Sequence, residues 1–210
     1  MANDPDYQHG SLEQLLVAAG PWYAVPERKY HNWDHAVSVH HTLLQLCPSV
    51  SFKALLAAVW HDAVYIPGSQ FNELASADAL CYTAKLLGSS EWLDMAEAAG
   101  TLVKATSIAT HQTPEHIKGE LAYLLDADLH SLGAGEYCKF VERQLAIAEE
   151  WCTPYSFRFK ETREVALRNQ AAFLHDLRGR RSHLFHTQEA RELFEVNAHN
   201  NILRFYQENC

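Results

Sequence analysis

Apolar residues recur three and four positions apart along most of the chain, and alternating runs of β-branched residues are few. This spacing is typical of helices that bury one face, and it predicts an all-α protein. Such segments, separated by Pro, Gly or polar breaks, are predicted over residues 11–20, 32–47, 52–65, 72–88, 89–111, 116–133, 135–152, 156–177 and 188–207. We therefore expect a helical bundle of roughly eight to ten helices.

The organisation of the chain favours a single domain. No internal repeat, low-complexity tract or Pro/Gly/Ser-rich linker divides the 210 residues, and 48% of them are hydrophobic, as in an ordinary globular protein. We expect residues 1–210 to form one domain.

Charge and composition exclude several partners. The formal net charge is −9, with only 17 Lys and Arg scattered along the chain, which argues against a surface for a nucleic acid polymer. The chain begins with no basic stretch followed by an apolar one, and no apolar run approaches the roughly 18 residues of a membrane span. We expect a cytoplasmic protein with no membrane partner, in which the five cysteines are free thiols because no CxxC pair occurs.

The first candidate for chemistry is the stretch "VWHDAVY" over residues 59–65, where His61 and Asp62 come near the end of the most apolar predicted helix. An unpaired carboxylate in an apolar interior costs several kcal/mol, so a partner is expected, and a divalent cation binds imidazole and carboxylate together. Adjacent helical residues point about 100° apart, so other helices must supply further ligands.

Two other segments offer such ligands. "RKYHNWDH" over residues 28–35 places His31 and His35 four residues apart, on one face of a helix start. "LLDADLHSLG" over residues 124–133 places Asp126 and Asp128 in an apolar helix. For Asp126 we expect a salt bridge or a position on the helix surface rather than ligation, and Asp128 is the better candidate for a metal ligand.

The order of a histidine, a His-Asp pair and a distant aspartate resembles the HD-domain superfamily, in particular a subgroup of predicted metal-dependent phosphohydrolases. The matching elements are "RKYHNWDH" (28–35), "WHDAVY" (60–65), "NELASA" (72–77), "TSIATH" (106–111), "LLDADLHSLG" (124–133) and "EARELFEVNAHNNI" (189–202). The resemblance covers nearly the whole chain. It implies an HD-type helical bundle in which residues from about 135 to 210 form a C-terminal helical extension.

The resemblance also implies a ligand set. The family's metal ligands correspond to His35, His61, Asp62 and Asp128, and this mixture of nitrogen and oxygen suits Mn²⁺, Co²⁺, Ni²⁺, Fe²⁺ or Zn²⁺, while Mg²⁺ is also compatible. His111 would be an additional ligand if the site held a second ion. It is the one intermediate histidine with a convincing motif, which favours one ion over two.

Further residues are implied around the substrate. Arg28 and His31 could contact phosphate oxygens, and Tyr65 is a candidate for lining the substrate pocket. Asp62, His31 and Glu73 are the candidate catalytic residues.

The role of Glu73 stays open. Some HD hydrolases have a glutamate three residues after the His-Asp pair, where this chain has Tyr65. Glu73 could supply that group from the next helix, or it could simply occupy a first helical turn, where the helix dipole favours a carboxylate.

The function implied is that of a metal-dependent phosphohydrolase that uses metal-activated water to cleave a phosphoester or phosphoanhydride of a small molecule, nucleotides being among the candidates. Two alternatives remain open: an HD-type di-iron oxygenase, which needs His111 and a further histidine, and a non-catalytic HD ligand-binding protein. The expected partner is a small phosphorylated substrate, and the chain is expected to be a monomer or a homodimer.

Overall fold

The protein is an all-α bundle in a computed structural model that describes residues 13–87, 90–111, 117–157, 161–180 and 182–210. No strand occurs among these residues. The α-helices are α1 (Glu13–Val17), α2 (Trp33–Leu46), α3 (Phe52–Trp60), α4 (Asn72–Leu87), α5 (Ser90–Lys104), α6 (Ile108–His111), α7 (Glu120–Leu129), α8 (Tyr137–Trp151), α9 (Arg163–Arg180), α10 (Gln188–Ala190) and α11 (Val196–Asn209).

The prediction of eight to ten helices is confirmed. The short α10, the π-helical turn η4 (Arg191–Glu195) and α11 follow one another without a break, so they form a single C-terminal rod and the described chain has ten helical rods. None of the described helices is long and apolar enough to cross a membrane.

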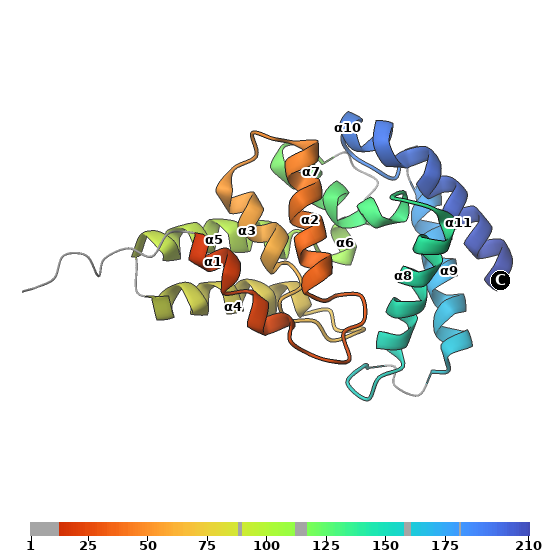
Figure 1. Ribbon diagram of the computed structural model, residues 1–210, viewed down its shortest axis with the longest axis horizontal. Helices are drawn as coiled ribbons and strands as arrows, with labels where there is room; N and C mark the ends of the chain where they lie inside the picture. The colour runs from red at the N-terminus through yellow and green to blue at the C-terminus, as the bar shows by residue number, and fades with distance from the viewer. Residues whose placement is uncertain (1–12, 88–89, 112–116, 158–160, 181) are drawn as a thin grey trace, which may run out of the picture.

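The helices form two neighbouring groups (Figure 1). In the first, α4 packs along α5, while the apolar α3 contacts α2, α5 and α7. In the second, α9 packs against both α8 and α11. The side chain of Trp60, at the end of α3, is fully buried, and its Nε1 donates a hydrogen bond to the carbonyl of Leu15 at 2.8 Å. This bond fixes α1 against the end of α3.

Several helix ends differ from the sequence prediction. The segment predicted over residues 52–65 ends at Trp60, because the chain turns there and Ser76 Oγ binds both the N–H and the carbonyl of Val64. Ser51 stands at the N-cap of α3, but its hydroxyl makes no capping hydrogen bond. The segment predicted over residues 89–111 is divided into α5 and α6. The predicted ends at residues 11, 88, 89 and 116 lie outside the described residues.

Candidate metal centre

Two helix ends bring the first two histidines together. The side chain of Asn32 caps α2 by accepting a hydrogen bond from the backbone N–H of His35 at 3.2 Å, so His35 lies in the first turn. His61 follows the last residue of α3, and its Nδ1 donates to the carbonyl of Ala58 at 2.9 Å. Because that bond places a proton on Nδ1, the Nε2 lone pair of neutral His61 is available to a metal ion.

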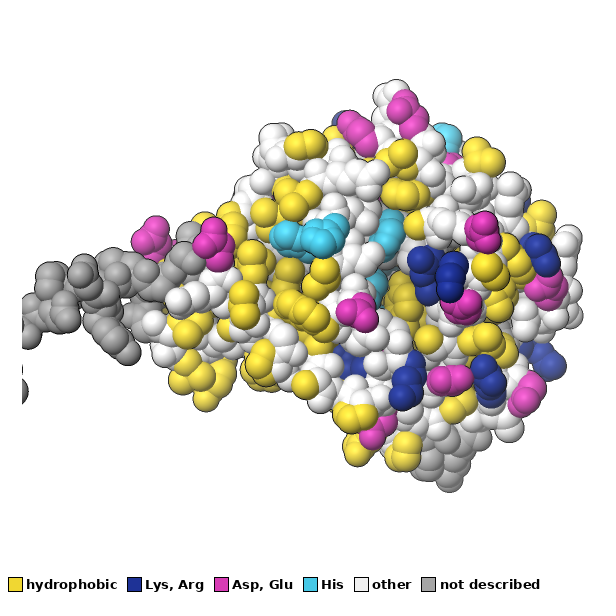
Figure 2. Space-filling view, in the orientation of Figure 1, with side chains coloured by type: hydrophobic (Ala, Val, Ile, Leu, Met, Phe, Trp, Pro, Cys, Tyr) yellow, Lys and Arg dark blue, Asp and Glu magenta, His cyan; other side chains and the backbone are white. Residues whose placement is uncertain are grey.

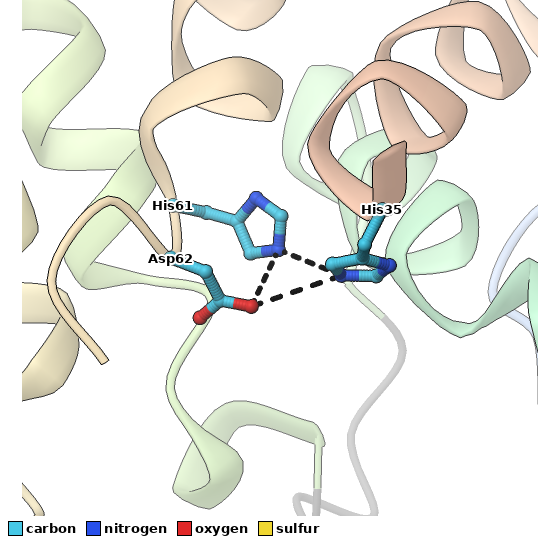
Figure 3. Close-up of side chains that lie close together, drawn as sticks. All are labelled: His35, His61 and Asp62. Atoms are coloured by element: carbon cyan, nitrogen blue, oxygen red, sulfur yellow. Dashed lines mark hydrogen bonds and ion pairs between the residues drawn. The ribbon is translucent and has the colours of Figure 1, made fainter. Parts of the chain in front are cut away.

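His35, His61 and Asp62 point toward one another (Figure 3). The Nε2 atoms of His35 and His61 are 3.3 Å apart, and Asp62 Oδ2 lies 3.1 Å from His61 Nε2 and 3.7 Å from His35 Nε2. Asp128, near the end of α7, adds a fourth group, with its Oδ1 3.3 Å from His35 Nε2 and 3.4 Å from His61 Nε2. The four predicted metal ligands therefore meet, although they come from three helices.

The spacing of these atoms fits one divalent ion. Ligands held about 2.1 Å from one metal at neighbouring coordination positions lie about 3.0–3.4 Å from each other, which is close to most of the distances above. Two imidazole nitrogens with carboxylate oxygens are a donor set that suits a divalent transition metal. His35, His61 and Asp62 could thus hold such an ion, and Asp128 lies beside them with its Oδ1 near both histidines.

The electrostatics of the cluster favour a positive charge. Burial, the largest single influence, would raise the pKa of Asp62 and of Asp128, but the neighbouring imidazoles, His61 foremost, together outweigh it and hold both pKa values below their ordinary range. Burial likewise opposes the charged form of His61, yet the two carboxylates hold its pKa well above the ordinary value. For His35 burial dominates, and its pKa is lowered. The carboxylates of Asp62 and Asp128 thus share the protonated imidazole of His61 as a cationic partner. A bound metal ion could supply that positive charge instead.

His111, the candidate for a second ion, is buried in α6 with its Nε2 3.3 Å from Asp128 Oδ2. Its Nδ1 is buried and has no hydrogen-bond partner among the described residues. Within the described ranges, the one group of three or more possible ligands whose atoms all lie within 4.8 Å is His35, His61 and Asp62. The same criterion leaves out Asp128, so His111 lies beside this three-residue group, at the second oxygen of Asp128, and among the described residues it brings no further histidine with it.

A cavity of about 670 Å³ opens onto the centre. His61, Asp62, Asp128 and His111 line it, whereas no Lys or Arg does among the residues described. Figure 2 shows histidines near the middle of one face, while most Lys and Arg on that face lie over the C-terminal helices. An anion in this cavity would therefore depend on a bound cation for charge balance.

Three other candidate residues line the same cavity. Glu73 is in the first turn of α4, and burial, its largest influence, raises its pKa. Tyr65 stacks on His31, with ring centroids 3.9 Å apart and planes at 20°. The structure thus brings Glu73, His31 and Tyr65 to the cavity that also reaches the metal centre.

Glu150 is a residue of the site that sequence reasoning missed. It lies at the end of α8, is 1% exposed, and accepts hydrogen bonds from the backbone N–H of Tyr30 at 2.7 Å, from that of His31 at 2.9 Å and from His31 Nδ1 at 2.6 Å. Burial opposes both charges, but each group stabilises the other, so the pKa of His31 is raised and that of Glu150 is lowered. The sequence around Glu150 does not indicate that its partner, His31, lies 119 residues away.

This pair predicts a pH dependence of stability in metal-free protein. Glu150 contributes above its unfolded pKa of 4.5, and the contribution falls as pH drops through its lower folded pKa. His31 contributes below its unfolded pKa of 6.5, and the contribution falls as pH rises through its higher folded pKa. The difference in unfolding free energy between the wild type and Glu150→Gln should thus be largest between about pH 4.5 and 6.5. Urea titrations across the pH range check this, and a pH-independent difference would contradict it.

Arg28, which we expected to contact phosphate oxygens, binds backbone carbonyls in the structure. Its guanidinium donates to the carbonyls of Asp62, of Ala63 at 3.2 Å and of Trp22 at 3.3 Å, and Arg28 is not among the cavity-lining residues. Its side chain also lies over the ring of Tyr23, 4.6 Å from the centroid. Because buried carbonyls need donors, Arg28 instead fixes the backbone that carries Asp62.

We expect Arg28→Met to lower the free energy of unfolding by about 1–3 kcal/mol and to weaken metal binding, since the backbone of Asp62 loses its donor. Arg143→Met is the matched control, because Arg143 donates to the carbonyls of Ser131 at 3.0 Å and Ala134 at 2.9 Å, away from Asp62. Urea unfolding and calorimetric titration with Mn²⁺ measure both effects. Equal metal affinity in the two variants would contradict this role.

Asp126 binds backbone N–H groups inside the protein and does not lie on the helix surface, which was one of the two expectations for it. It is fully buried and accepts hydrogen bonds, each of 2.7 Å, from the backbone N–H of His186 and from both the N–H and the hydroxyl of Thr187. Thr187 is the N-cap of α10, so Asp126 joins α7 to the start of the C-terminal rod.

Comparisons of the chain with protein-family models, with curated proteins and with solved structures give no match.

Proposed function

We propose that the protein is a metal-dependent phosphohydrolase that cleaves a phosphoester or phosphoanhydride of a small molecule. The observation that carries this proposal is the convergence of His35, His61, Asp62 and Asp128, of which the last three line a cavity of about 670 Å³. The sequence resemblance to HD-domain phosphohydrolases supports the same activity. A bound divalent ion would supply Lewis-acid activation of water and neutralise charge on the phosphoryl oxygens.

The residues of the cavity have separate tasks in this reaction. Hydrogen bonding of His31 Nδ1 to Glu150 leaves Nε2 as the other ring nitrogen, and the raised pKa of His31 favours the form in which Nε2 carries a proton for a phosphate oxygen. Glu73, whose pKa burial raises, could transfer a proton to the leaving oxygen. Because no Lys or Arg is among the described lining residues, the bound ion would supply positive charge for the phosphoryl group of the substrate.

The di-iron oxygenase has less support. It needs His111 and at least one more histidine around a second ion, and among the residues described His111 has a close contact with Asp128 alone of the four ligands. No specific observation favours a non-catalytic binding protein over an enzyme.

The proposal is tested by measuring phosphate release from a panel of phosphomonoesters, nucleotides and pyrophosphate with Mn²⁺, Co²⁺, Ni²⁺ or Mg²⁺. We expect release from at least one compound, loss of release after chelation, and recovery when the metal is restored. A preparation that holds about one ion per chain and releases no phosphate would contradict the proposal and favour the non-catalytic alternative. Two irons per chain with oxygen consumption would favour the oxygenase.

A further inference from the structure

One side of the cavity is chemically unlike the metal centre. It is formed by α8 and α9, and we call it the α8–α9 wall. Its residues are Gln144, Ile147, Trp151, Gln170, Phe173, Leu174 and Leu177. No charged side chain occurs among them, so this wall suits an uncharged and mainly apolar part of a ligand.

Gln144 is an unusual residue for this wall. It lies on the buried stripe of α8, four residues after Phe140 and three before Ile147, and it is 1% exposed. Its Oε1 accepts a hydrogen bond from Gln170 Nε2 at 3.1 Å. Among the described residues its own Nε2 has no hydrogen-bond partner, and this nitrogen is not one of the fully enclosed polar atoms. Because Gln144 lines the cavity, the donor is available to a ligand that enters it.

Gln170 completes a paired recognition surface. It is half-buried on α9, and its Oε1 also lacks a hydrogen-bond partner among the residues described. The two side chains thus present one free donor, Gln144 Nε2, beside one free acceptor, Gln170 Oε1. Reversing both amides exchanges these roles and still leaves one donor and one acceptor.

We propose that Gln144 and Gln170 are specificity-determining residues that bind an uncharged, planar part of the substrate with an amide-type edge, as on a heterocyclic base. Adjacent donor and acceptor groups on glutamine match such an edge, which also offers one donor and one acceptor. Phe173 and Leu174 provide apolar surface for the faces of the ring. The phosphoryl group would lie at the metal centre and the ring against the α8–α9 wall of the same cavity.

This inference rests on the proposed function for the position of the phosphoryl group, but its test needs neither phosphate nor metal. Adenosine, guanosine, cytidine and uridine are titrated calorimetrically into metal-free wild type, Gln144→Leu and Gln170→Leu. Gln70→Leu is the matched control, because Gln70 is an exposed residue of the same cavity, outside the α8–α9 wall. We expect at least one nucleoside to bind the wild type, about tenfold or more weakly to each wall variant, and within about twofold of wild type to the control.

Thermal unfolding establishes which variants are folded, and Gln170→Leu carries the test alone if Gln144→Leu does not fold, because Gln170 is only half-buried. Binding of none of the four nucleosides would overturn the inference. Binding that is unchanged in folded wall variants would also overturn it and would assign the pair to packing between α8 and α9. Nucleoside binding without any phosphate release would uphold this inference while contradicting the proposed function, and phosphate release without nucleoside binding would do the reverse.

Discussion

Asp62→Asn is expected to weaken divalent metal binding and to lower phosphate release by at least about 100-fold each. Asparagine keeps the size and one oxygen of the side chain but loses the charge that faces His61 Nε2 at 3.1 Å and His35 Nε2 at 3.7 Å. A neutral amide oxygen is a weaker ligand for a divalent ion than a carboxylate. Calorimetric titration with Mn²⁺ and a phosphate-release assay measure the two losses.

Glu73→Gln is the matched control for this variant, because it makes the same change from acid to amide on the same cavity. It should bind metal as the wild type does and lose phosphate release alone if Glu73 transfers the proton. Wild-type metal affinity in a folded Asp62→Asn variant would contradict the assignment of Asp62 as a ligand.

Asp126→Ala is expected to have the largest effect on stability, lowering the free energy of unfolding by about 3–5 kcal/mol. The substitution removes the acceptor for the backbone N–H groups of His186 and Thr187, which lie at the start of the C-terminal rod. Urea denaturation of metal-free protein measures the loss. A change of less than about 1 kcal/mol would contradict the role of Asp126.

Asp128→Asn, two residues away, is expected to affect metal binding rather than stability. Its oxygens face His35, His61 and His111, so the variant should lose metal affinity while metal-free stability changes far less than in Asp126→Ala. Together the two aspartates separate a structural carboxylate from a ligating one. Loss of metal affinity in folded Asp126→Ala, with none in Asp128→Asn, would reverse the assignment.

The fold class and part of the metal centre could be predicted from local sequence. Helical periodicity correctly predicted the all-α bundle, and the polar pair His61-Asp62 after an apolar run indicated that partners had to come from elsewhere. Asp128 faces the histidines, as the sequence indicated. Asp126 is bound by backbone N–H groups in the interior, whereas the sequence had suggested a salt bridge or a helix-surface position.

Other features depend on contacts that no local pattern encodes. The charge of Arg28 suggested a contact with phosphate. In the structure its guanidinium donates to backbone carbonyls 34 and 35 residues away, and the local sequence does not encode these contacts. The bond of Glu150 to His31 and that of Gln144 to Gln170 likewise depend on how α8 packs. The usable signal was the presence of two polar residues, Gln144 and Glu150, among the buried positions of α8.

The most direct test of the metal centre is the anomalous scattering of crystals grown with Mn²⁺. We expect one strong peak about 2.0–2.4 Å from Nε2 of His35, Nε2 of His61 and a carboxylate oxygen of each of Asp62 and Asp128. Crystals of Mn²⁺-loaded protein with no peak among these four side chains, or with the ion bound elsewhere, would contradict the centre proposed for this protein.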